Sequence, residues 1–323
     1  MAADIAYPVE LVAPDISAYR RGNVGVDYVQ TFDSGVAGPD AMINAVIHGN
    51  ELCGAIAIDY LMRSDIRPAR GKLTLAFVNP EAYLRFDPAA PGRSRFVDED
   101  MNRVWTLERL DGPDNTVELR RARQLRPLYD RVDRLLDIHS MGTYSDPIML
   151  IHGLEKERRL TREIGYPAMI ACGAGHVQGL RLIEYAPFND PATDRIACLV
   201  ECGQHWAATS ADVAIDTALH YLRALGMIDE ATLAAHRRTD PVPEQTVADV
   251  THGYAIRTDD FFFTQAFKGL ERFAKAGAVI AVDGGEEIRT PYDDCILVMP
   301  NHRAVKGQRA FRLARLGGGS ATD

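Results

Sequence analysis

Near its amino terminus the chain changes abruptly from a strand-like pattern to a helical one, and this change constrains the fold more than any other feature. Residues 42–47 form an apolar run, residues 48–51 (HGNE) interrupt it, and residues 52–61 resume the apolar pattern at helical spacing. The pattern predicts a buried strand, a short turn and a helix. His48 is then expected at the carboxyl end of the strand and Glu51 in the first helical turn. In open α/β sheets this edge is where ligands bind.

Strand-like and helix-like segments continue to alternate as far as residue 225, which predicts an α/β fold with a mixed central sheet flanked by helices. The expected strands are residues 24–32, 42–47, 73–78, 135–138, 148–151 and 196–200. The expected helices are residues 51–63, 116–134, 154–164, 211–225 (with Ser210 as N-cap) and 229–238. The intervening residues 80–115 lack a clear periodicity, which is typical of a functional loop.

The composition shifts after residue 240. Residues 240–243 (DPVP) are interpreted as a linker. Short strand-like runs separated by Gly turns follow at residues 246–250, 261–267, 278–282, 295–299 and 309–313. The sequence therefore predicts two domains, an α/β catalytic domain at residues 1–239 and a smaller all-β domain at residues 240–323.

The overall charge and the cysteines restrict the class of protein. A net charge of −9 argues against nucleic acid or an anionic membrane as the main partner, because both require a basic surface. No apolar run is long enough for a transmembrane helix, and the amino terminus lacks the basic start and apolar middle of a signal peptide. The five cysteines form no CxxC pair, which indicates reduced thiols in a cytoplasmic protein.

The HxxE spacing of His48 and Glu51 is a weak signal by itself. The same spacing recurs at His152 and Glu155. There, Glu155 begins a run of charged residues, which is typical of a solvated helix face. Features elsewhere in the chain must decide which pair has a function.

Two later strands also end in chemically reactive residues, His139 and Glu201. If His139 converges with His48 and Glu51, the three form a site with two histidines and one carboxylate. Catalytic zinc takes three such protein ligands and keeps a fourth position for water, whose pKa it lowers to about 7. A separate carboxylate is then needed to take up the proton and pass it on. Glu201 is the natural candidate for that role.

The loop at residues 95–103 adds polar groups suited to an amide substrate that carries a carboxylate. Arg95, Asn102 and Arg103 together supply a planar fork for bidentate pairing and polar donors for an oxyanion. His205 follows Glu201 closely and is expected to line the substrate pocket.

Four segments in order give the chain a family resemblance: residues 48–51 (HGNE), the loop 95–103 that ends in DMNR, residues 137–139 (DIH) and residues 200–203 (VECG). Together they resemble the succinylglutamate desuccinylase and aspartoacylase family, within the zinc carboxypeptidase-like fold. Each segment alone is modest, and their order makes the resemblance strong.

The resemblance implies a role for each residue of the expected metal site. His48, Glu51 and His139 would bind one zinc ion per chain, and Glu201 would be the general base and acid. Asp100 would orient His48, because metal-bound histidines usually need a partner on the other ring nitrogen.

The resemblance also implies how a substrate is held. Arg95 would polarise the scissile carbonyl, Asn102 and Arg103 would bind the carboxylate of the amino-acid part, and the C-terminal β-domain would cover the mouth of the site. The chain departs from aspartoacylase, because residues 298–305 contain no tyrosine and Arg195 does not match the spacing of the arginine before the catalytic glutamate. These departures argue against N-acetylaspartate as the substrate.

The sequence thus predicts a zinc-dependent amidohydrolase that removes an acyl group from a small N-acyl amino acid or related amide. Two alternatives stay open: a metallocarboxypeptidase acting on a peptide, and a non-catalytic zinc- or ligand-binding protein. The expected partner is a small molecule, with neither nucleic acid nor membrane. Homo-oligomerisation is left open.

Overall fold

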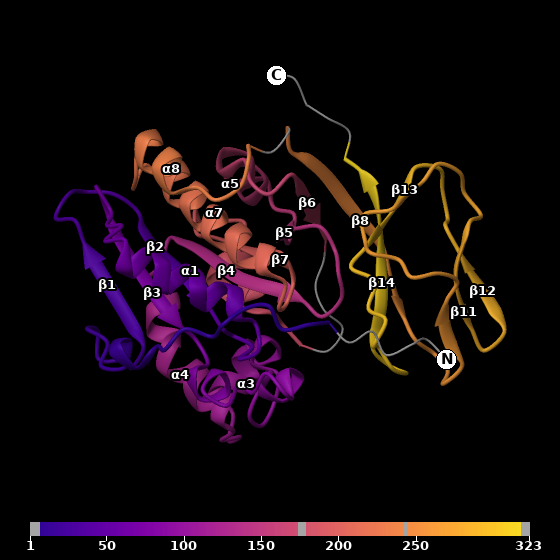
Figure 1. The fold of residues 1–323 in the computed structure, drawn as a ribbon, viewed down its shortest axis with the longest axis horizontal. Helices are drawn as coiled ribbons and strands as arrows, with labels where there is room; N and C mark the ends of the chain where they lie inside the picture. The colour runs from indigo at the N-terminus through magenta and orange to yellow at the C-terminus, as the bar shows by residue number, and fades with distance from the viewer. Residues whose placement is uncertain (1–6, 174–178, 242–243, 318–323) are drawn as a thin grey trace.

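The computed structural model of the chain describes residues 7–173, 179–241 and 244–317. In this part of the chain an 11-stranded mixed sheet runs through the molecule, and a 3-stranded antiparallel sheet lies at its C-terminal side (Figure 1). The large sheet contains, in spatial order, β1 (Val29–Asp33), β3 (Lys72–Phe77), β2 (Asp40–Ala45), β4 (Arg134–Met141), β7 (Ile196–Gln204), β5 (Ile148–Ile151), β6 (Met169–Cys172), β8 (Thr246–Ala255), β14 (Arg309–Leu316), β13 (Cys295–Val298) and β10 (Arg272–Phe273). The small sheet contains β12 (Glu286–Arg289), β11 (Val279–Asp283) and β9 (Phe261–Phe263).

Four neighbouring strands of the large sheet, β3, β2, β4 and β7, are parallel. The strands β1 and β5 run antiparallel to their neighbours β3 and β7, so the sheet is mixed, as predicted. Because parallel strands end at the same edge of a sheet, the residues that follow β2, β4 and β7 are brought together at one edge.

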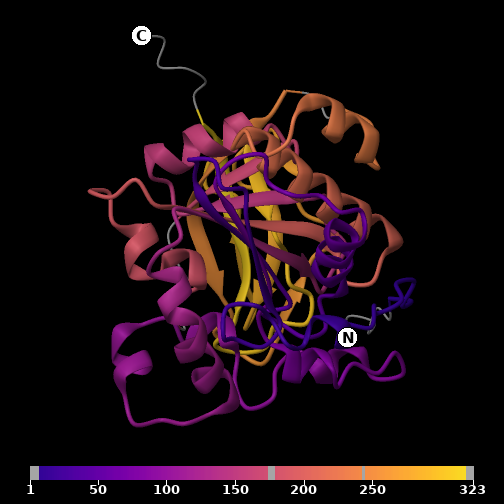
Figure 2. The same ribbon diagram turned by 90° about the vertical axis from the view of Figure 1, so that its left-hand side faces the viewer.

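Helices cover both faces of the α/β part of this sheet (Figures 1 and 2), which confirms the predicted fold class. One face is covered by α1 (Leu52–Arg63), α5 (Glu155–Ile164), α7 (Ala208–Ala224) and α8 (Glu230–His236), and the other by α3 (Leu107–Asp111), α4 (Val117–Tyr129) and α6 (Ala186–Asn189). Shorter turns are α2 (Pro80–Tyr83) and the 3-10 turns η1 (Ser17–Tyr19), η2 (Pro91–Ser94), η3 (Met101–Arg103) and η4 (Leu182–Glu184). No helix among the described residues is long and apolar enough to cross a membrane.

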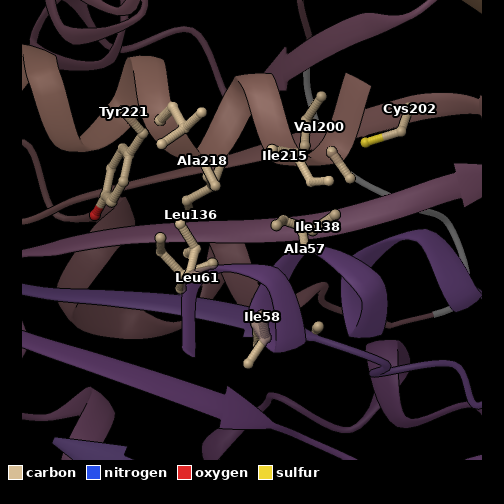
Figure 3. Close-up of a cluster of buried hydrophobic side chains, with 14 of the residues drawn as sticks. Ala57, Ile58, Leu61, Leu136, Ile138, Val200, Cys202, Ile215, Ala218 and Tyr221 are labelled. Carbon is tan, nitrogen blue, oxygen red and sulfur yellow. The ribbon is translucent and has the colours of Figure 1, made fainter. Parts of the chain in front are cut away.

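The core beneath α1 and α7 shows how β4 is oriented (Figure 3). Leu136 and Ile138 of β4 are fully buried in the same cluster as Leu61 of α1. Burying such a side chain contributes about 1.5–3 kcal/mol. Because successive strand residues point to opposite faces, Asp137 and His139 lie on the other face of the sheet. The apolar alternation of β4 therefore fixes the side on which its polar residues lie.

Ser210 is not the N-cap of α7, so that prediction is wrong. The helix begins at Ala208 with Ala207 as its N-cap, and the Ser210 hydroxyl donates to the Ala207 carbonyl at 2.8 Å. The backbone N–H of Ala208 donates instead to Glu10 Oε2 at 2.8 Å. The long-range partner Glu10 replaces the local cap that the sequence pattern favoured.

Other predicted elements differ from the structure mainly at their ends. The strand expected at 24–32 is limited to β1, because turns precede it, and the helix expected at 116–134 ends at Tyr129, close after Pro127. The short strands β6, β10 and β12 were not predicted. The sequences of β10 (RF) and β12 (EEIR) contain no apolar run that would indicate a strand.

The C-terminal region joins the α/β part through backbone pairing. The strand β8 pairs in parallel with β6, and β14, β13 and β10 extend the sheet from there. A third apolar cluster, which includes Phe311 and Ile280, lies between these strands and the small sheet. The division between residues 239 and 240 stays a prediction. Of the expected linker 240–243, residues 242–243 lie outside the described residues.

Candidate metal centre and active-site cavity

His48, Glu51 and His139 converge at the carboxyl edge of the sheet, as the sequence predicted. The Nδ1 atom of His48 lies 2.8 Å from Glu51 Oε1, and the Nδ1 atom of His139 lies 2.9 Å from Glu51 Oε2. One ligand atom from each residue lies within 4.8 Å of the others, and all three residues are buried. Among the residues that the structure describes, this is the one group of three or more His, Cys, Asp or Glu side chains close enough together to hold a metal ion.

The outer nitrogens of both imidazoles are bound by aspartates. The Nε2 atom of His48 lies 2.8 Å from Asp100 Oδ1, and the Nε2 atom of His139 lies 2.9 Å from Asp137 Oδ2. A carboxylate on one ring nitrogen leaves the lone pair of the other nitrogen free for a metal, which is the usual arrangement of metal-bound histidines. Two imidazole nitrogens and one carboxylate are also a zinc donor set. The residues present therefore fit a zinc ion.

The cluster contains strongly coupled charges. Burial alone would raise the pKa of Glu51, but His48 and His139 hold that pKa well below its usual range. Burial alone would lower the pKa of His139, but Asp137 and Glu51 raise it well above the ordinary histidine value. The site therefore attracts positive charge, which a metal cation can supply in place of protons.

A strained turn delivers His48 to the cluster. Val46 has a φ of 55°, in the left-handed region that β-branched residues rarely adopt. This turn ends β2 at Ala45, two residues before the predicted end of the strand. Gly49 then passes so close to the chain that a Cβ there would lie 2.4 Å from Tyr83 N and 2.5 Å from Ser94 O. Only glycine fits this position.

Asp100 and Arg95 lie against the cluster, from the loop that the sequence singled out. Asp100 caps η3 by accepting from Asn102 N at 2.9 Å, and it lies 3.2 Å from Arg95 Nη2. Arg95 Nη2 is 3.0 Å from His48 Nε2, and its Nη1 is 3.5 Å from Glu51 Oε1. Burial would raise the pKa of Asp100, but His48 and Arg95 hold it far below the usual range. A guanidinium group thus borders the metal centre.

Glu118 of α4 holds this loop in place, and sequence reasoning missed it. Its fully buried carboxylate accepts from the backbone N–H groups of Val97 (2.7 Å), Asp98 (3.0 Å) and Glu99 (3.3 Å). The charged amphipathic helix expected at residues 116–134 gave no sign of this contact. The loop is therefore fixed by a side chain from outside it.

Asn102 and Arg103 reach the cavity but already have protein partners. Asn102 Nδ2 lies 3.4 Å from His139 Nε2, and its Oδ1 accepts from Leu182 N at 2.8 Å. Arg103 Nη1 donates to the Asn102 carbonyl at 2.6 Å. Asn102 therefore lies beside His139 and binds the η4 segment.

Glu201 lies beside the metal centre with one carboxylate oxygen unused. It occupies the position on β7 that pairs with His139 on β4. The side chain is 8% exposed, and its Oε2 has no hydrogen-bond partner among the described residues. Burial raises the pKa of Glu201 to about 8. A carboxyl group with a free oxygen and this pKa can take up and release a proton near neutral pH.

These residues line one cavity of about 620 Å³. The cavity also contains His205, and residues 299–301 of the C-terminal region form part of its wall. The structure therefore brings every residue of the predicted site to a single cavity.

Further arginines of the cavity lining were missed by sequence reasoning. Arg181, Arg309 and Arg312 line the same cavity as Arg95 and Arg103. Arg181 pairs with Glu184 at 3.1 Å. Burial and the neighbouring arginines lower the pKa of Arg312 to about 9. The wall is therefore suited to an anionic group.

The weaker sequence candidates lie outside the metal cluster. Glu155 is exposed and lies 3.8 Å from Arg162, so the second HxxE segment forms part of a solvated helix. His152 Nδ1 lies 3.8 Å from Glu184 Oε1. Arg195 directly precedes the amino end of β7, whereas Glu201 lies toward the carboxyl end of that strand. The Arg195 side chain donates to the carbonyl of Asp130.

The fold and this buried cluster define an α/β protein with a two-histidine, one-carboxylate centre at a sheet edge. A profile of the succinylglutamate desuccinylase/aspartoacylase catalytic domain matches residues 37–225. The chain belongs to the succinylglutamate desuccinylase/aspartoacylase family.

Individual relatives agree with this assignment. A probable aspartoacylase from Parasynechococcus marenigrum is 32% identical over 123 residues, which cover 35% of this chain and 38% of that protein. The aligned region thus spans little more than a third of that relative.

Solved structures resemble the fold at low sequence identity. A succinylglutamate desuccinylase from Vibrio cholerae has a TM-score of 0.63 and 19% identity, covering 90% of this chain and 86% of that chain. The ectoine utilization protein EutE from Ruegeria pomeroyi has a TM-score of 0.62 and 16% identity, covering 89% and 88%. An aspartoacylase family protein from Mesorhizobium loti has a TM-score of 0.64 and 18% identity, covering 90% and 89%.

Proposed function

We propose that this protein is a zinc-dependent amidohydrolase that removes an acyl group from a small N-acyl amino acid. The observation that carries the proposal is the meeting of His48, Glu51 and His139 beside the unpaired carboxyl oxygen of Glu201. Relatives named succinylglutamate desuccinylase and probable aspartoacylase support an acylated amino acid as the substrate class.

His48, Glu51 and His139 would hold the zinc ion. When bound there, zinc supplies a Lewis acid and lowers the pKa of water to about 7. Glu201 takes the proton from the attacking water and later delivers it to the nitrogen of the leaving amine. Burial raises the pKa of Glu201 above the ordinary carboxyl value, which favours its second role, the delivery of the proton to the leaving amine.

Arginines supply the charge for the substrate in this proposal. Arg95, within 3.5 Å of Glu51, donates to the carbonyl oxygen as negative charge develops on it. Arg103, with Asn102 next to it, binds the carboxylate of the amino-acid part. The proposal also includes a cytoplasmic location and a C-terminal β-domain at residues 240–323 that narrows the mouth of the cavity.

Metal analysis and kinetics test this proposal. The purified protein is expected to hold about one zinc ion per chain, and His48→Ala and His139→Ala are expected to lose it. Glu201→Gln is expected to keep the zinc and to hydrolyse N-acyl amino acids about 10²–10⁴ times more slowly. His152→Ala, from the second HxxE segment, is the matched histidine control and should retain zinc.

Three outcomes would contradict the proposal in different ways. A protein that binds no transition metal would lack the proposed centre. Faster hydrolysis of C-terminal residues from peptides than of N-acyl amino acids would favour the carboxypeptidase alternative. Zinc binding without hydrolysis of either substrate class would favour a non-catalytic binding protein.

A further inference from the structure

A serine next to a proposed metal ligand contacts a third histidine, which the proposed mechanism does not use. Ser140 follows His139 on β4, and its backbone N–H donates to Glu51 Oε2 at 3.1 Å. Its hydroxyl oxygen lies 2.8 Å from Nδ1 of His205. Ser140 and His205 are 4% and 6% exposed. His205 is therefore one residue removed from the metal cluster.

The direction of this hydrogen bond follows from what each group can do. A serine hydroxyl carries one hydrogen, and a neutral imidazole has one donor and one acceptor nitrogen. Among the described residues, the structure shows one hydrogen-bond acceptor for the Ser140 hydroxyl, the Nδ1 atom of His205. If Nδ1 carried the hydrogen, the buried hydroxyl would be left without an acceptor, which costs free energy. The Ser140 hydroxyl therefore donates to Nδ1, and the ring hydrogen is on Nε2.

The imidazole is also fixed in place and uncharged. The backbone N–H of His205 donates to the Met141 carbonyl at 2.8 Å, and the neighbouring ring of Trp206 lies 5.6 Å away, centroid to centroid. Burial lowers the pKa of His205 to about 3; the negative charge of Glu51 opposes this shift, and the Arg95 guanidinium reinforces it. The ring is therefore neutral over the range in which an enzyme of this type works.

The hydrogen on Nε2 is available to the cavity. His205 lines the cavity, and the structure shows no hydrogen-bond partner for Nε2 among the described residues. A Cβ at Gly142 would lie 3.7 Å from this atom, so the glycine leaves open space beside it. Thr143, the next residue along the chain, donates from Oγ1 to the Pro300 carbonyl at 2.9 Å. This part of the cavity lining is therefore bound to the C-terminal segment.

We propose that His205 is a fixed, neutral donor that gives its Nε2 hydrogen to an oxygen atom of the substrate, and that Ser140 is the positioning residue that selects this tautomer. The proposal deepens the proposed function and rests on it for the chemistry of the substrate. It implies a carbonyl or carboxylate oxygen at this wall of the cavity. A substrate ammonium group would be disfavoured there, because it offers no acceptor.

The tautomer can be measured without a substrate. In ¹⁵N-labelled protein, the ring nitrogens of His205 are expected to show the neutral form protonated on Nε2 between pH 5 and pH 9, two values that bracket the ordinary histidine pKa of about 6.5. Ser140→Ala is expected to give a mixture of tautomers, whereas Ser140→Thr, which keeps the hydroxyl, is expected to retain the wild-type form. A ring protonated on Nδ1, or Ser140→Ala with an unchanged tautomer, would overturn the assignment.

Acetate is the probe for the donor itself. In the zinc-loaded protein, His205→Phe is expected to weaken acetate binding about tenfold or more, because it removes one hydrogen bond to a charged acceptor. His205→Gln keeps an N–H near the Nε2 position and is expected to stay within about threefold of wild type. The matched control is His236→Phe, on α8, which pairs with Tyr60 and lies outside the cavity lining.

The outcomes separate this proposal from the proposed function. Equal acetate affinity in wild type and His205→Phe, an equal loss in both His205 variants, or no acetate binding at all would contradict the donor. If the donor is supported and no N-acyl amino acid is hydrolysed, the hydrolase proposal alone fails. Thermal unfolding of each variant identifies any loss that comes from misfolding.

Discussion

Each imidazole of the candidate metal centre uses its two ring nitrogens for different partners. Nδ1 faces Glu51, and Nε2 is bound by Asp100 in one case and by Asp137 in the other. The aspartates therefore determine which nitrogen presents its lone pair. This division of roles makes the aspartates testable parts of the site.

Asp137→Asn is expected to weaken zinc binding about 10–100-fold, because an amide is a poorer acceptor for the His139 Nε2 hydrogen than a carboxylate. Competition with a chelator of known affinity measures the effect. Asp293→Asn is the control, since Asp293 pairs with Lys275 in an exposed turn. Equal zinc affinity in Asp137→Asn and wild type would show that Asp137 does not support the ligand.

Glu201 is expected to make the metal-free protein sensitive to pH. Its pKa is about 8 in the folded chain against 4.5 ordinarily, so the folded state binds the proton more tightly than the unfolded state. The contribution of the protonated carboxyl to stability is fully present below pH 4.5 and is lost as the pH rises to about 8. Above that pH, metal-free Glu201→Gln is expected to be more stable than wild type by as much as about 5 kcal/mol.

Urea unfolding of both metal-free proteins at pH 5 and pH 9 measures this difference, since these values lie on either side of a pKa of about 8. The gap between variant and wild type should widen with pH. A constant gap would mean that burial does not raise the pKa of Glu201.

Sequence reasoning reached some site residues and not others for physical reasons. Glu201 and His48 each directly follow an apolar run, and His139 follows a short strand that is apolar except for Asp137, so the chain itself marks them. Asp137 could also have been assigned, because it shares a strand face with His139 two residues away. Arg309 and Arg312 come from β14, which reaches the cavity only through its pairing with β8, and no local pattern contains that information.

At the scale of elements, the loop at residues 95–103 is held by a helix that contributes nothing directly to the metal centre. Glu118 accepts three backbone hydrogen bonds from it while fully buried. In Glu118→Gln one of the two accepting oxygens is replaced by an NH₂ group, which would face backbone N–H groups that are donors themselves. We expect a loss of about 2–4 kcal/mol in the free energy of unfolding and weaker zinc binding, since Asp100 lies in the loop.

Hydrogen exchange measures the same contact locally. The amide hydrogens of Val97 and Asp98 are expected to exchange faster in Glu118→Gln than in wild type. Glu108→Gln, on the exposed surface of α3, is the control and should change neither property. Unchanged protection at both amides would contradict the role of Glu118.

Elements with a strong period were predictable, and those set by tertiary contacts were not. The strand at residues 148–151 was predicted with its observed ends, because four apolar residues lie between Pro147 and His152. The start of α7 was misplaced because Glu10, nearly two hundred positions away, binds its first N–H. Local cap signals cannot show such a partner.

At the scale of the whole molecule, the residues that line the cavity differ in charge from the chain as a whole. The chain has a net charge of −9, yet Arg95, Arg103, Arg181, Arg309 and Arg312 all line one cavity. An acidic surface around a basic cavity disfavours non-specific binding to polyanions and still admits a small anion. This pattern is consistent with an anionic substrate under the proposed function.

The continuous sheet predicts that the two parts of the chain unfold together. β6 and β8 share backbone hydrogen bonds, and β14 carries two arginines of the cavity wall. Calorimetry of the full chain is therefore expected to show a single transition. Phe311→Ala, which empties a position 1% exposed in the C-terminal cluster, is expected to cost about 3–5 kcal/mol.

The whole transition should shift with that substitution, including a probe of the metal centre such as zinc release. Exposed Phe262→Ala is the control, because its side chain is 51% exposed and its loss removes little buried area. Two separate transitions, with zinc retained while the C-terminal strands melt, would contradict coupled unfolding. That result would instead support residues 1–239 and 240–323 as independent folding units, with the cavity wall contributed by a separate domain.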